Sequence, residues 1–584
     1  MKRVLTYIAF AVLPLFSAVA QWSNNHAEPY WVNDDGAYFY EYNVAQSPNG
    51  KTWLWLESGQ SHHYVQLFDT TGVTLLGDEM KLVSDYQNRL TGYVNQNMFV
   101  DRDGNAIIVV SDLRYSSVEE DLATFTAYKI SQEGEMLWGT QGVSLDGGVG
   151  TSIGAMMGIA QLTDGSYVFA WTHSDYEIFT IELQRVSADG ELLWDANETR
   201  LTDPRGEISY FWPYIVDAGN NQCILVYTKG ANLELHARKI DFDGAPVWSE
   251  DTRIYRSGFL STPLWTLLTV EPSGDGGVVV TWYDDRNATG IESIYMSYVK
   301  PNGELGFTAG IDGQKLCYSD LRALSTTCKY DPASDSFIAL WREATQAQGA
   351  YRVVAQSVSK DGDLLWGDEG LEVEPLTQDV NYGDLTLHYG REGEMALFYL
   401  KRNGLAFGNI DVRMQLLDTR KGELLWNESR IISDANTPTE KTDFHVSAMS
   451  PQQSFVIGWD DRGVDSNPDY KRIYLHRVNY DATIGNPVAG DDAAVATLQA
   501  GCKSMTVVNP LVSDQAHFVV RAEAGTPATL TIYNMNGVCV ATPFDGVCRA
   551  AEEHITWRAP LSAGIYIATL RTPTTVENIK LLIL

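Results

Sequence analysis

Short apolar runs alternate with polar, glycine-containing turns through most of the chain. Examples of the runs are 106–110, 166–171, 278–282 and 454–459, each preceded by a cluster of Asp, Gly, Asn, Ser or Gln. Continuous apolar runs of this length, rich in β-branched and aromatic residues, indicate strands that are buried on both faces. The pattern therefore predicts an all-β body joined by tight hairpins.

One phrase recurs along this body: a polar residue and a glycine, a few mostly apolar residues, then an aromatic residue. The glycines of the phrase lie 54 to 62 residues apart, at Gly72, Gly134, Gly190, Gly244, Gly303, Gly362 and Gly422. Asp-Gly or Asn-Gly supplies a turn with positive φ, so the phrase predicts a hairpin whose short second strand carries the tryptophan. A fixed period near this length indicates a propeller or another repeat array.

Each repeat holds a second hairpin upstream of the phrase, which gives four antiparallel strands, or one propeller blade, per repeat. Counting these turns predicts an eight-bladed β-propeller, with seven blades plus an extra hairpin as the alternative. The last repeat shows no clear Trp-bearing strand after Ala482, whereas Tyr30-Trp31 resembles such a strand near the start of the chain. We expect Tyr30-Trp31 to complete the final blade; the alternative is a loose N-terminal arm.

Length and charge narrow the possible functions. A chain of 584 residues is too long for one ordinary core. Its 44% hydrophobic and 20% charged residues exclude global disorder. With 42 basic and 75 acidic residues, the net charge of −33 argues against electrostatic binding to nucleic acid or anionic lipid as the main activity.

The first twenty residues have the pattern of a secretory signal peptide. Lys2 and Arg3 precede an apolar run over 4–16, and the small residues of 18–20 follow. We expect cleavage between Ala20 and Gln21; a retained membrane anchor is the alternative, although the run is short for a membrane span. No transmembrane segment is expected in the mature chain.

Export would permit disulfides among the six cysteines. Cys317 with Cys328, and Cys539 with Cys548, are close enough in sequence to form local disulfides. Six cysteines allow 15 pairings, so spacing leaves the connectivity open.

Polar residues follow some of the apolar runs and form the candidate binding site. The sequences Asp284-Asp285-Arg286 and Asp460-Asp461-Arg462 are the clearest examples, and Asp112…Arg114 is a weaker match to the same pattern. One interpretation is a ring of acidic groups and arginines at one rim of the propeller, suited to a cation or a polar glycan. The other is that Asp and Arg cap strand ends and pair within the scaffold, because features repeated in several blades usually serve the fold.

No catalytic or cofactor motif accompanies these residues. The loop 101–105 resembles a calcium-binding loop but lacks the acidic ligand that such a loop needs downstream, so we expect an ordinary turn. No nucleophile elbow, zinc-binding His pair or phosphate loop is present. We therefore expect no cofactor and no metal, with calcium unsupported, and assign no catalytic residue.

Composition changes near the C-terminus. Residues 491–505 have the character of a linker after the propeller at 21–490, and 506–584 show a new all-β pattern predicting a small antiparallel sandwich. Its marked features are Asn509-Pro510 at the start, Tyr533 and Gly537 around a turn, Gly564 and Tyr566 around another, and Lys580 in the terminal strand.

This combination, at the extreme C-terminus behind a signal peptide, resembles the C-terminal sorting domain of the type IX (Por) secretion system of Bacteroidota. The resemblance covers about 80 residues. It implies recognition by the type IX machinery, passage across the outer membrane, removal of the domain, and attachment to the cell surface or release. An ordinary fibronectin-like accessory domain is the alternative.

We therefore expect a secreted or surface-attached binding propeller, not an enzyme, that recognises an extracellular protein or glycan. The alternative is a secreted hydrolase acting on glycans or peptides with carboxylates at the propeller channel; a structural surface-layer component is a third possibility. Asymmetry discriminates the first two: a hydrolase should place a few non-repeated acidic and aromatic residues at one channel mouth, some with perturbed pKa.

Overall fold

The computed structural model describes most of the chain, and all structural statements concern these residues. They are 22–25, 29–32, 39–59, 61–86, 98–116, 122–148, 153–174, 178–195, 200–256, 268–286, 289–404, 409–433, 440–462, 471–486, 505–507, 511–512, 515–521, 525–534, 539–549, 552–558, 564–572 and 576–583. The chain divides into two compact units, Met1–Asn486 and Pro487–Leu584. The predicted signal cleavage residues, Ala20 and Gln21, lie outside the described residues.

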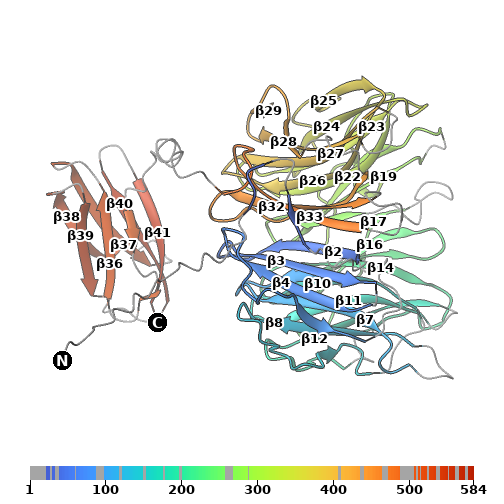
Figure 1. Ribbon diagram of the computed structural model, residues 1–584, viewed down its shortest axis with the longest axis horizontal. Coiled ribbons are helices and arrows are strands. Elements are labelled where there is room, and N and C mark those ends of the chain that lie inside the picture. Colours follow the sequence, from blue (N-terminus) through green and yellow to red (C-terminus); the bar gives the residue numbers. More distant parts are fainter. Residues whose placement is uncertain are drawn as a thin grey trace, which may run out of the picture. The chain divides into compact units, whose positions relative to one another are not determined.

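The first unit consists of antiparallel sheets, which we number as blades along the chain (Figure 1). Blades 1 to 4 are β2 (Phe39–Gln46), β3 (Thr52–Ser58), β4 (His63–Phe68) and β5 (Lys81–Ser84); β6 (Met98–Val100), β7 (Ala106–Asp112), β8 (Thr124–Ile130) and β9 (Val143–Ser144); β10 (Ile153–Gln161), β11 (Tyr167–Ser174), β12 (Phe179–Val186) and β13 (Arg200–Leu201); and β14 (Tyr210–Asp217), β15 (Cys223–Lys229), β16 (Glu234–Ile240) and β17 (Thr252–Tyr255).

Blades 5 to 8 repeat the meander. They are β18 (Thr269–Pro272), β19 (Val278–Asp284), β20 (Ser293–Val299) and β21 (Gln314–Lys315); β22 (Arg322–Asp331), β23 (Ser336–Ala344), β24 (Ala350–Ser359) and β25 (Leu371–Gln378); β26 (Val380–Tyr389), β27 (Glu394–Asn403), β28 (Ile410–Asp418), β29 (Glu423–Leu424) and β30 (Arg430–Ser433); and β31 (Glu440–Val446), β32 (Ser454–Arg462), β33 (Lys471–Asn479) and β1 (Tyr30–Trp31). The helical element of the described residues is the 3-10 turn η1 (Gly310–Asp312).

The blades close into a ring. The first strands of neighbouring blades lie beside one another, from β10 to β14, β18, β22, β26 and β31, and β31 lies beside β2 of blade 1, which lies beside β6. Blades 2 and 3 share one hydrophobic cluster around Val109, Phe125 and Trp171. Each first strand is therefore the inner strand of its blade, next to the axis of the ring. The predicted all-β propeller is confirmed.

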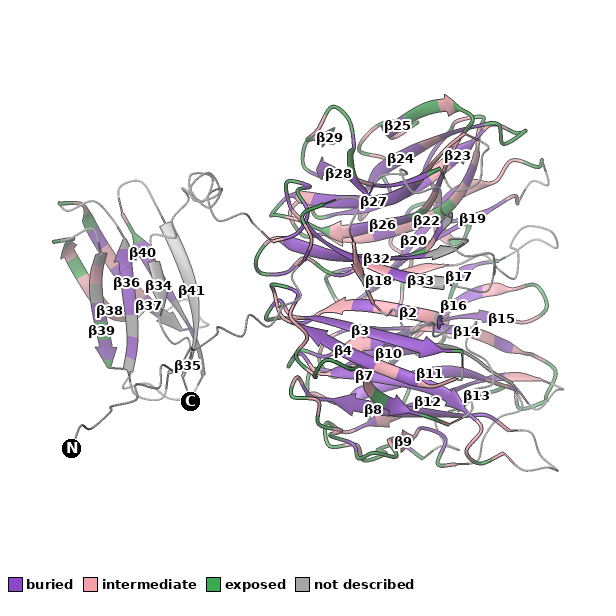
Figure 2. Cartoon of the chain, in the orientation of Figure 1, coloured by how far each residue is buried: buried purple, intermediate pink, exposed green. Residues whose placement is uncertain are grey.

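Burial follows the apolar runs that define the strands. All seven residues of β3, β7 and β8 are buried, and Figure 2 shows such strands in purple between more exposed turns. Inner strands such as β22 and β26 alternate buried residues with intermediate or exposed ones. The inner strands therefore bring polar side chains to the axis, while the middle strands form the core.

The N-terminal segment completes the last blade, as the sequence predicts. Tyr30 pairs with Leu475 and Trp31 with Tyr474, so β1 adds antiparallel to β33 as the outer strand of blade 8. Upstream, Trp22 is buried in the cluster shared by blades 1 and 8, and its backbone N–H donates to the carbonyl of Thr71 over 3.2 Å. The loose-arm alternative is thus wrong for these residues.

The recurring tryptophans connect one blade to the next. Trp138, Trp194 and Trp248 donate their indole N–H groups to carbonyl oxygens in the glycine turn of the following blade, over 2.9–3.0 Å. The expected short strand carrying the tryptophan is wrong: after the turn, blade 7 forms the two-residue strand β29 and the other blades form an isolated bridge, such as Ile130 with Met136. The tryptophan lies beyond these pairs, and Trp138 precedes the fourth strand β9. Leaving the sheet early is what lets the indole reach the neighbouring turn.

The C-terminal unit contains two sheets that face a shared core. One has β34 (Met505–Val507), β36 (Gln515–Arg521) and β39 (Glu552–Arg558); the other has β35 (Leu511–Val512), β41 (Val576–Ile583), β40 (Gly564–Arg571), β37 (Pro527–Asn534) and β38 (Cys539–Val547). Phe518 and Trp557 of the first sheet share a cluster with Leu530 and Leu570 of the second, which makes the unit a small sandwich. It is not wholly antiparallel, because β35 pairs parallel to β41.

Candidate functional site

The predicted rim residues of blade 5 hold the blade together. Asp284 is 1% exposed and accepts hydrogen bonds from Trp282 Nε1 (2.9 Å) and from the backbone N, Nε and Nη2 of Arg286 (2.8–3.0 Å). Asp285 accepts bonds from the Thr289 and Gly290 backbone N–H groups and so caps the following loop. Both carboxylates therefore accept hydrogen bonds from neighbouring groups of blade 5 itself.

Arg286 is clamped between aromatic rings and is shared between strands. Its guanidinium carbon lies 3.3 Å from the ring centroid of Tyr295 and 4.7 Å from that of Tyr255, and Nη1 donates to the Asp312 carbonyl. The neighbouring Asp284 holds the pKa of Arg286 above its usual value, against the opposing effect of burial. The interpretation in which Asp and Arg cap strand ends and pair fits these three residues.

Blade 2 repeats the same arrangement, as expected of a scaffold feature. Arg114 donates to both oxygens of Asp112, which is fully buried, and lies 4.2 Å above the ring of Tyr86. In blade 8, Asp460 is 1% exposed and accepts a bond from Thr442 Oγ1. Asp461 and Arg462 occupy the end of β32, where Asp461 pairs with Lys441 on β31, but their side chains lie outside the described residues.

Bulges in the inner strands form a second, unexpected set of candidate residues. The register shifts between Phe211 and Tyr214 of β14, and at the corresponding positions of β2, β10, β22, β26 and β31. In four of these bulges a non-glycine residue has a φ of 47–52°: Trp212, Ser325, Asp384 and Asp443. Side chains held in this sparsely populated region cluster at binding and catalytic sites, where bulges redirect a side chain.

The bulge recurs from blade to blade, but the residue at its positive-φ position differs between blades. Tryptophan, serine and aspartate occupy the same bulge position in different blades, with the two aspartates on the adjacent blades 7 and 8. Asp384 and Asp443 are both exposed. The inner surface is therefore chemically asymmetric, which is the discriminating feature that the sequence alone does not supply.

The two bulge aspartates, Asp384 and Asp443, form a cluster of acidic side chains with Asp460 around Tyr42. Burial raises the pKa of Tyr42 well above its ordinary value, and the charges of Asp460, Asp443 and Asp384 raise it further. Tyr42 therefore stays protonated and donates its hydroxyl to the Asp443 carbonyl. The strands β2, β26, β31 and β32 of three consecutive blades position these groups.

The environment of Asp384 disfavours ionisation of its carboxyl group. Burial among protein atoms raises the pKa of Asp384, although water still reaches its side chain, and the charge of Asp443 adds to that rise. A hydrogen bond from the Phe444 backbone N–H and the charge of Arg342 act in the opposite direction. A carboxyl group with a raised pKa beside a second carboxylate is an arrangement suited to general acid chemistry.

A polar cavity lies beside Asp384. Its volume is about 170 Å³, and its lining comes from β23, β26, β27, β28 and β31: Arg342, Asn381, Tyr382, Gly383, Asp384, Leu400, Arg402, Ile410, Lys441 and Thr442. Arg342 donates from Nη1 to Asn381 Oδ1 over 3.0 Å and to the Tyr382 carbonyl. Burial lowers the pKa of Arg342 below its ordinary value, against the opposing charges of Tyr351, Asp384 and Tyr283.

The residues of this site carry little signal in the sequence, because each of them looks ordinary in isolation. Asp384 follows Gly383 inside an otherwise strand-like run, and Asp443 sits between Thr442 and Phe444 at the equivalent point of the next repeat. An aspartate in mid-strand, recurring in two successive repeats, is the signal that could have pointed to the bulge. Arg342 carries no comparable signal.

The loop 101–105 is the ordinary turn that the sequence predicts. Asp101 Oδ1 accepts bonds from the backbone N–H groups of Asp103 and Asn105 over 2.8–3.0 Å, and Gly104 has a φ of 85°. Within the described ranges, no group of three or more His, Cys, Asp or Glu side chains could hold a metal ion. Within the same ranges, no helix is both long and apolar enough to cross a membrane.

Neither of the two local disulfides that the spacing allows is formed. Cys317 and Cys328 are both free thiols in one hydrophobic cluster, and burial raises the pKa of Cys317 to about 11 and of Cys328 to about 12. Cys548 is also a free thiol, and Cys539 opens β38, which ends just before Cys548. An extended strand of this length separates its ends by about 30 Å, whereas a disulfide needs Cα atoms within about 7 Å.

The sorting-motif residues fall on the second sheet of the C-terminal sandwich or outside the described residues. Tyr533 and Lys580 each pair with Ile567 of β40, Gly564 begins β40, and Tyr566 is buried in the core. Asn509, Pro510 and Gly537 lie outside the described residues.

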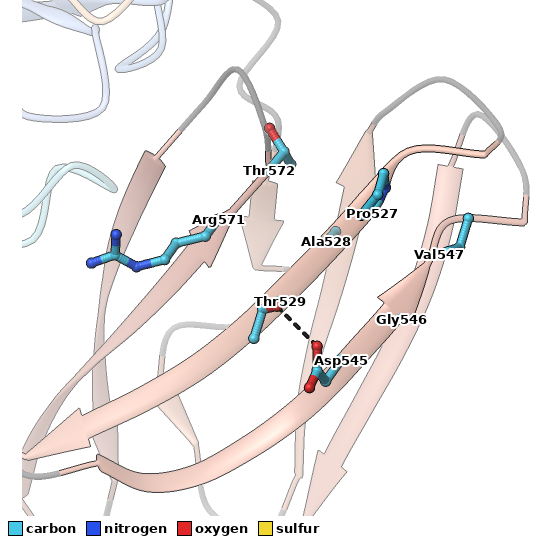
Figure 3. A pocket seen from close by; sticks show the side chains of 8 residues that line it. All are labelled: Pro527, Ala528, Thr529, Asp545, Gly546, Val547, Arg571 and Thr572. Atoms are coloured by element: carbon cyan, nitrogen blue, oxygen red, sulfur yellow. Dashed lines mark hydrogen bonds between the residues drawn. The ribbon is translucent and has the colours of Figure 1, made fainter.

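The same unit has a broad hollow beside the edge strand β38 (Figure 3). In it Thr529 Oγ1 donates to Asp545 Oδ1 over 3.0 Å, while the Arg571 side chain extends away from Asp545. The hollow of about 470 Å³ thus shows one cross-strand hydrogen bond and no convergence of its charged groups.

Comparison with known proteins finds solved structures that resemble this chain at low sequence identity. No protein-family model matches the chain, and no curated protein sequence matches it. Among solved structures, the BP39L lectin from Burkholderia pseudomallei is 10% identical, with 79% of this chain and 99% of the lectin covered and a TM-score of 0.37. The polysaccharide lyase Uly1 is 10% identical, with coverage of 69% and 94% and a TM-score of 0.39.

A third structure, the Dos1 propeller, is 10% identical over 74% of this chain and 92% of its own, with a TM-score of 0.36. Similarities of this size do not assign a ligand or a reaction to the chain. The function must therefore be argued from the residues at the axis of the ring.

Proposed function

We propose that the protein is a secreted or cell-surface β-propeller that binds a glycan at the cavity lined by β23 of blade 6, by β26, β27 and β28 of blade 7, and by β31 of blade 8. The observation that carries this proposal is the convergence of polar side chains from three strands, Asp384, Arg342, Asn381 and Thr442, around one cavity. Small concave sites with a few converging polar groups are typical of ligand sites. A lining of amide, hydroxyl and charged groups matches the hydroxyl groups of a sugar better than an apolar protein surface.

Glycan-array screening of the purified protein, followed by calorimetric titration of the best oligosaccharide, tests the proposal. We expect Asn381→Ala to weaken binding about tenfold, because a site built to hydrogen-bond a hydroxyl loses that bond. Asn232→Ala is the matched control, since Asn232 is exposed in the connection between β15 and β16 of another blade. Absence of binding to any glycan, or binding to a protein alone, would contradict the proposal.

A second candidate function is glycan hydrolysis at the same place, and the different bulge residues of the blades together with the raised pKa of Asp384 favour it. Asp384, with its raised pKa, and Asp443 on the next bulge supply the two carboxyl groups that most glycosidases need. Product analysis with the oligosaccharides that bind is the test, and Asp384→Asn should abolish turnover while leaving binding in place. If no bond is cleaved across a broad pH range, the protein is a binding module only.

We also propose export through the type IX secretion system. Support comes from the signal-like sequence over residues 1–20 and the sorting-like features of 506–584. The compact C-terminal sandwich, separate from the propeller unit, is the form that a removable sorting domain requires. In this proposal the propeller is the functional cargo and its ligand is extracellular.

A further inference from the structure

One half-buried arginine of the propeller, Arg342, lies beside the ring of Tyr351 but lacks the carboxylate partner that such groups ordinarily have. Arg342, at the end of β23, forms no ion pair with any described residue, and its Nε has no hydrogen-bond partner among them. Its two acceptors, Asn381 Oδ1 and the Tyr382 carbonyl, are neutral, and both are reached by Nη1 alone. A charge removed from water is ordinarily paired, because an isolated one carries a large desolvation cost.

Comparable arginines of the propeller show what is missing at Arg342. Arg352 donates to Glu343 over 2.7–2.8 Å, and Arg322 donates to Glu292; each arginine uses two guanidinium nitrogens. Arg286 donates to Asp284 in the same way. In each of these ion pairs, the guanidinium group binds a carboxylate that belongs to the propeller itself. Arg342 instead borders the cavity beside β26 and β31.

Two further cationic side chains and one carboxyl group line the cavity. Arg402 and the buried Lys441 line it together with Arg342, against the single carboxyl group of Asp384. Asn381 and Thr442 add an amide and a hydroxyl group at the same wall. Arg342, which forms no ion pair with a described residue, borders this space of about 170 Å³ and favours an anionic group of the size of a carboxylate or sulfate.

We propose that this cavity receives the negatively charged group, a carboxylate or a sulfate ester, of an acidic glycan, with Arg342 as its principal donor. The proposal rests on the glycan-binding function and names its ligand class. The Nη and Nε donors of Arg342 would bind the oxyanion, Asn381 and Thr442 the neighbouring hydroxyl groups. The exposed Asp384 and Asp443 would then face the remainder of the sugar ring.

Three matched oligosaccharides distinguish the sources of the charge: a galacturonate tetramer, a sulfated galactan tetramer and a neutral galactan tetramer. Calorimetric titration of the full chain should show tighter binding of at least one anionic tetramer than of the neutral one. Affinity for that tetramer should fall as salt rises, because the contact is electrostatic. Whichever anionic tetramer binds identifies the group as carboxylate or sulfate.

Variants locate the contact. Arg342→Gln should weaken the anionic tetramer tenfold or more and leave the neutral one within about twofold. Arg342→Lys should lie between, because it keeps the charge and loses the planar fork. Arg205→Gln is the matched control, as Arg205 is exposed near the start of blade 4. Thermal unfolding of each variant shows whether it is folded before it is titrated.

The outcomes separate this inference from the function on which it rests. Neutral and anionic tetramers bound equally well, or anionic binding unaffected in Arg342→Lys and Arg342→Gln, would overturn the anionic site while glycan binding stands. Failure of every oligosaccharide to bind would overturn the glycan-binding function itself, and the inference with it.

Discussion

The indole of Trp22 lies directly on Gly72. A Cβ atom built on Gly72, whose φ is 95°, would lie 2.8 Å from the backbone nitrogen and 3.0 Å from a ring carbon of Trp22. A similar contact joins Trp138 to Gly190 between blades 2 and 3, Trp248 to Gly303 between blades 4 and 5, and Trp366 to Gly422 between blades 6 and 7. The repeat that forms blade 8 lacks the tryptophan of the recurring phrase, and Trp22 takes that position. Trp22 thereby packs the last blade against the first.

Gly72→Ala should destabilise the closure of the ring. The added methyl group needs an unfavourable φ and displaces Trp22, so we expect a loss of about 1–3 kcal/mol in the free energy of unfolding. Gly165→Ala is the matched control, because Gly165 has a φ of 87° but nothing within 4 Å of its added Cβ. Equal losses in urea unfolding for the two variants would mean that the Trp22 contact contributes nothing.

Trp194→Ala should cost roughly 3–5 kcal/mol of stability, as is usual for a large buried aromatic side chain. Trp194 is 8% exposed, packs in the cluster shared by blades 3 and 4, and donates its indole N–H to the Phe242 carbonyl over 2.9 Å. Trp194→Phe keeps most of the packing and should cost about 1 kcal/mol for the lost hydrogen bond. An unchanged melting temperature for Trp194→Ala would contradict the role of these residues in joining blades.

The propeller should lose stability as the pH falls below about 6.5. Burial lowers the pKa of His63 to about 3, of His388 to about 3 and of His445 to about 4; Lys329 lowers that of His388 further, and Asp443 partly opposes the shift of His445. Between these values and about 6.5 the unfolded chain binds protons that the folded chain does not, so stability rises with pH across that window.

Each of these imidazoles should contribute roughly 1.4 kcal/mol per pH unit in that window. The ring of His388 packs edge-to-face against those of Phe398 and Phe455, so His388→Phe keeps an aromatic side chain there and removes the titrating group. Chemical unfolding at pH 7 and pH 5 should show a smaller difference for the variant than for the unmodified protein. Identical differences would exclude His388 as a source of the acid sensitivity.

Removing residues 506–584 should leave the propeller trapped in the periplasm of a cell with a type IX system. The physical reason is that the truncated chain keeps its signal-like sequence but loses the domain that the outer-membrane machinery would recognise. Fractionation and surface labelling measure the outcome. Normal surface display of the truncated protein would refute the sorting assignment, and export of an unrelated reporter fused to 487–584 would support it independently.

Local sequence predicted much of the fold because each blade is a local structure. The apolar runs and glycine turns act over a few residues, so the phrase around Gly134 and Trp138 indicates a hairpin without knowledge of its neighbours. Tyr30 and Trp31 could be assigned to blade 8 for a related reason: a repeat with a missing strand leaves an unsatisfied sheet edge, and the residues before the first repeat match it.

The placement of the aromatic residues and the thiols could not be derived in this way. Trp138 leaves the strand register to meet a turn about fifty residues away, and Cys317 and Cys328 share a core without bonding. Both outcomes depend on how neighbouring sheets pack against one another. Spacing along the chain carries no information on that packing.

The sequence by itself determined the all-β repeat, the closing strand and the acidic character of the protein, since these follow from short-range patterns and composition. Only the tertiary structure decided where chemistry is concentrated. It buried Asp284 in the scaffold through bonds to Trp282 and Arg286, and it brought Arg342 and Asp384 from different blades to one cavity. Closing the ring places the inner strands of distant repeats next to one axis, and that proximity is a property of three-dimensional packing alone.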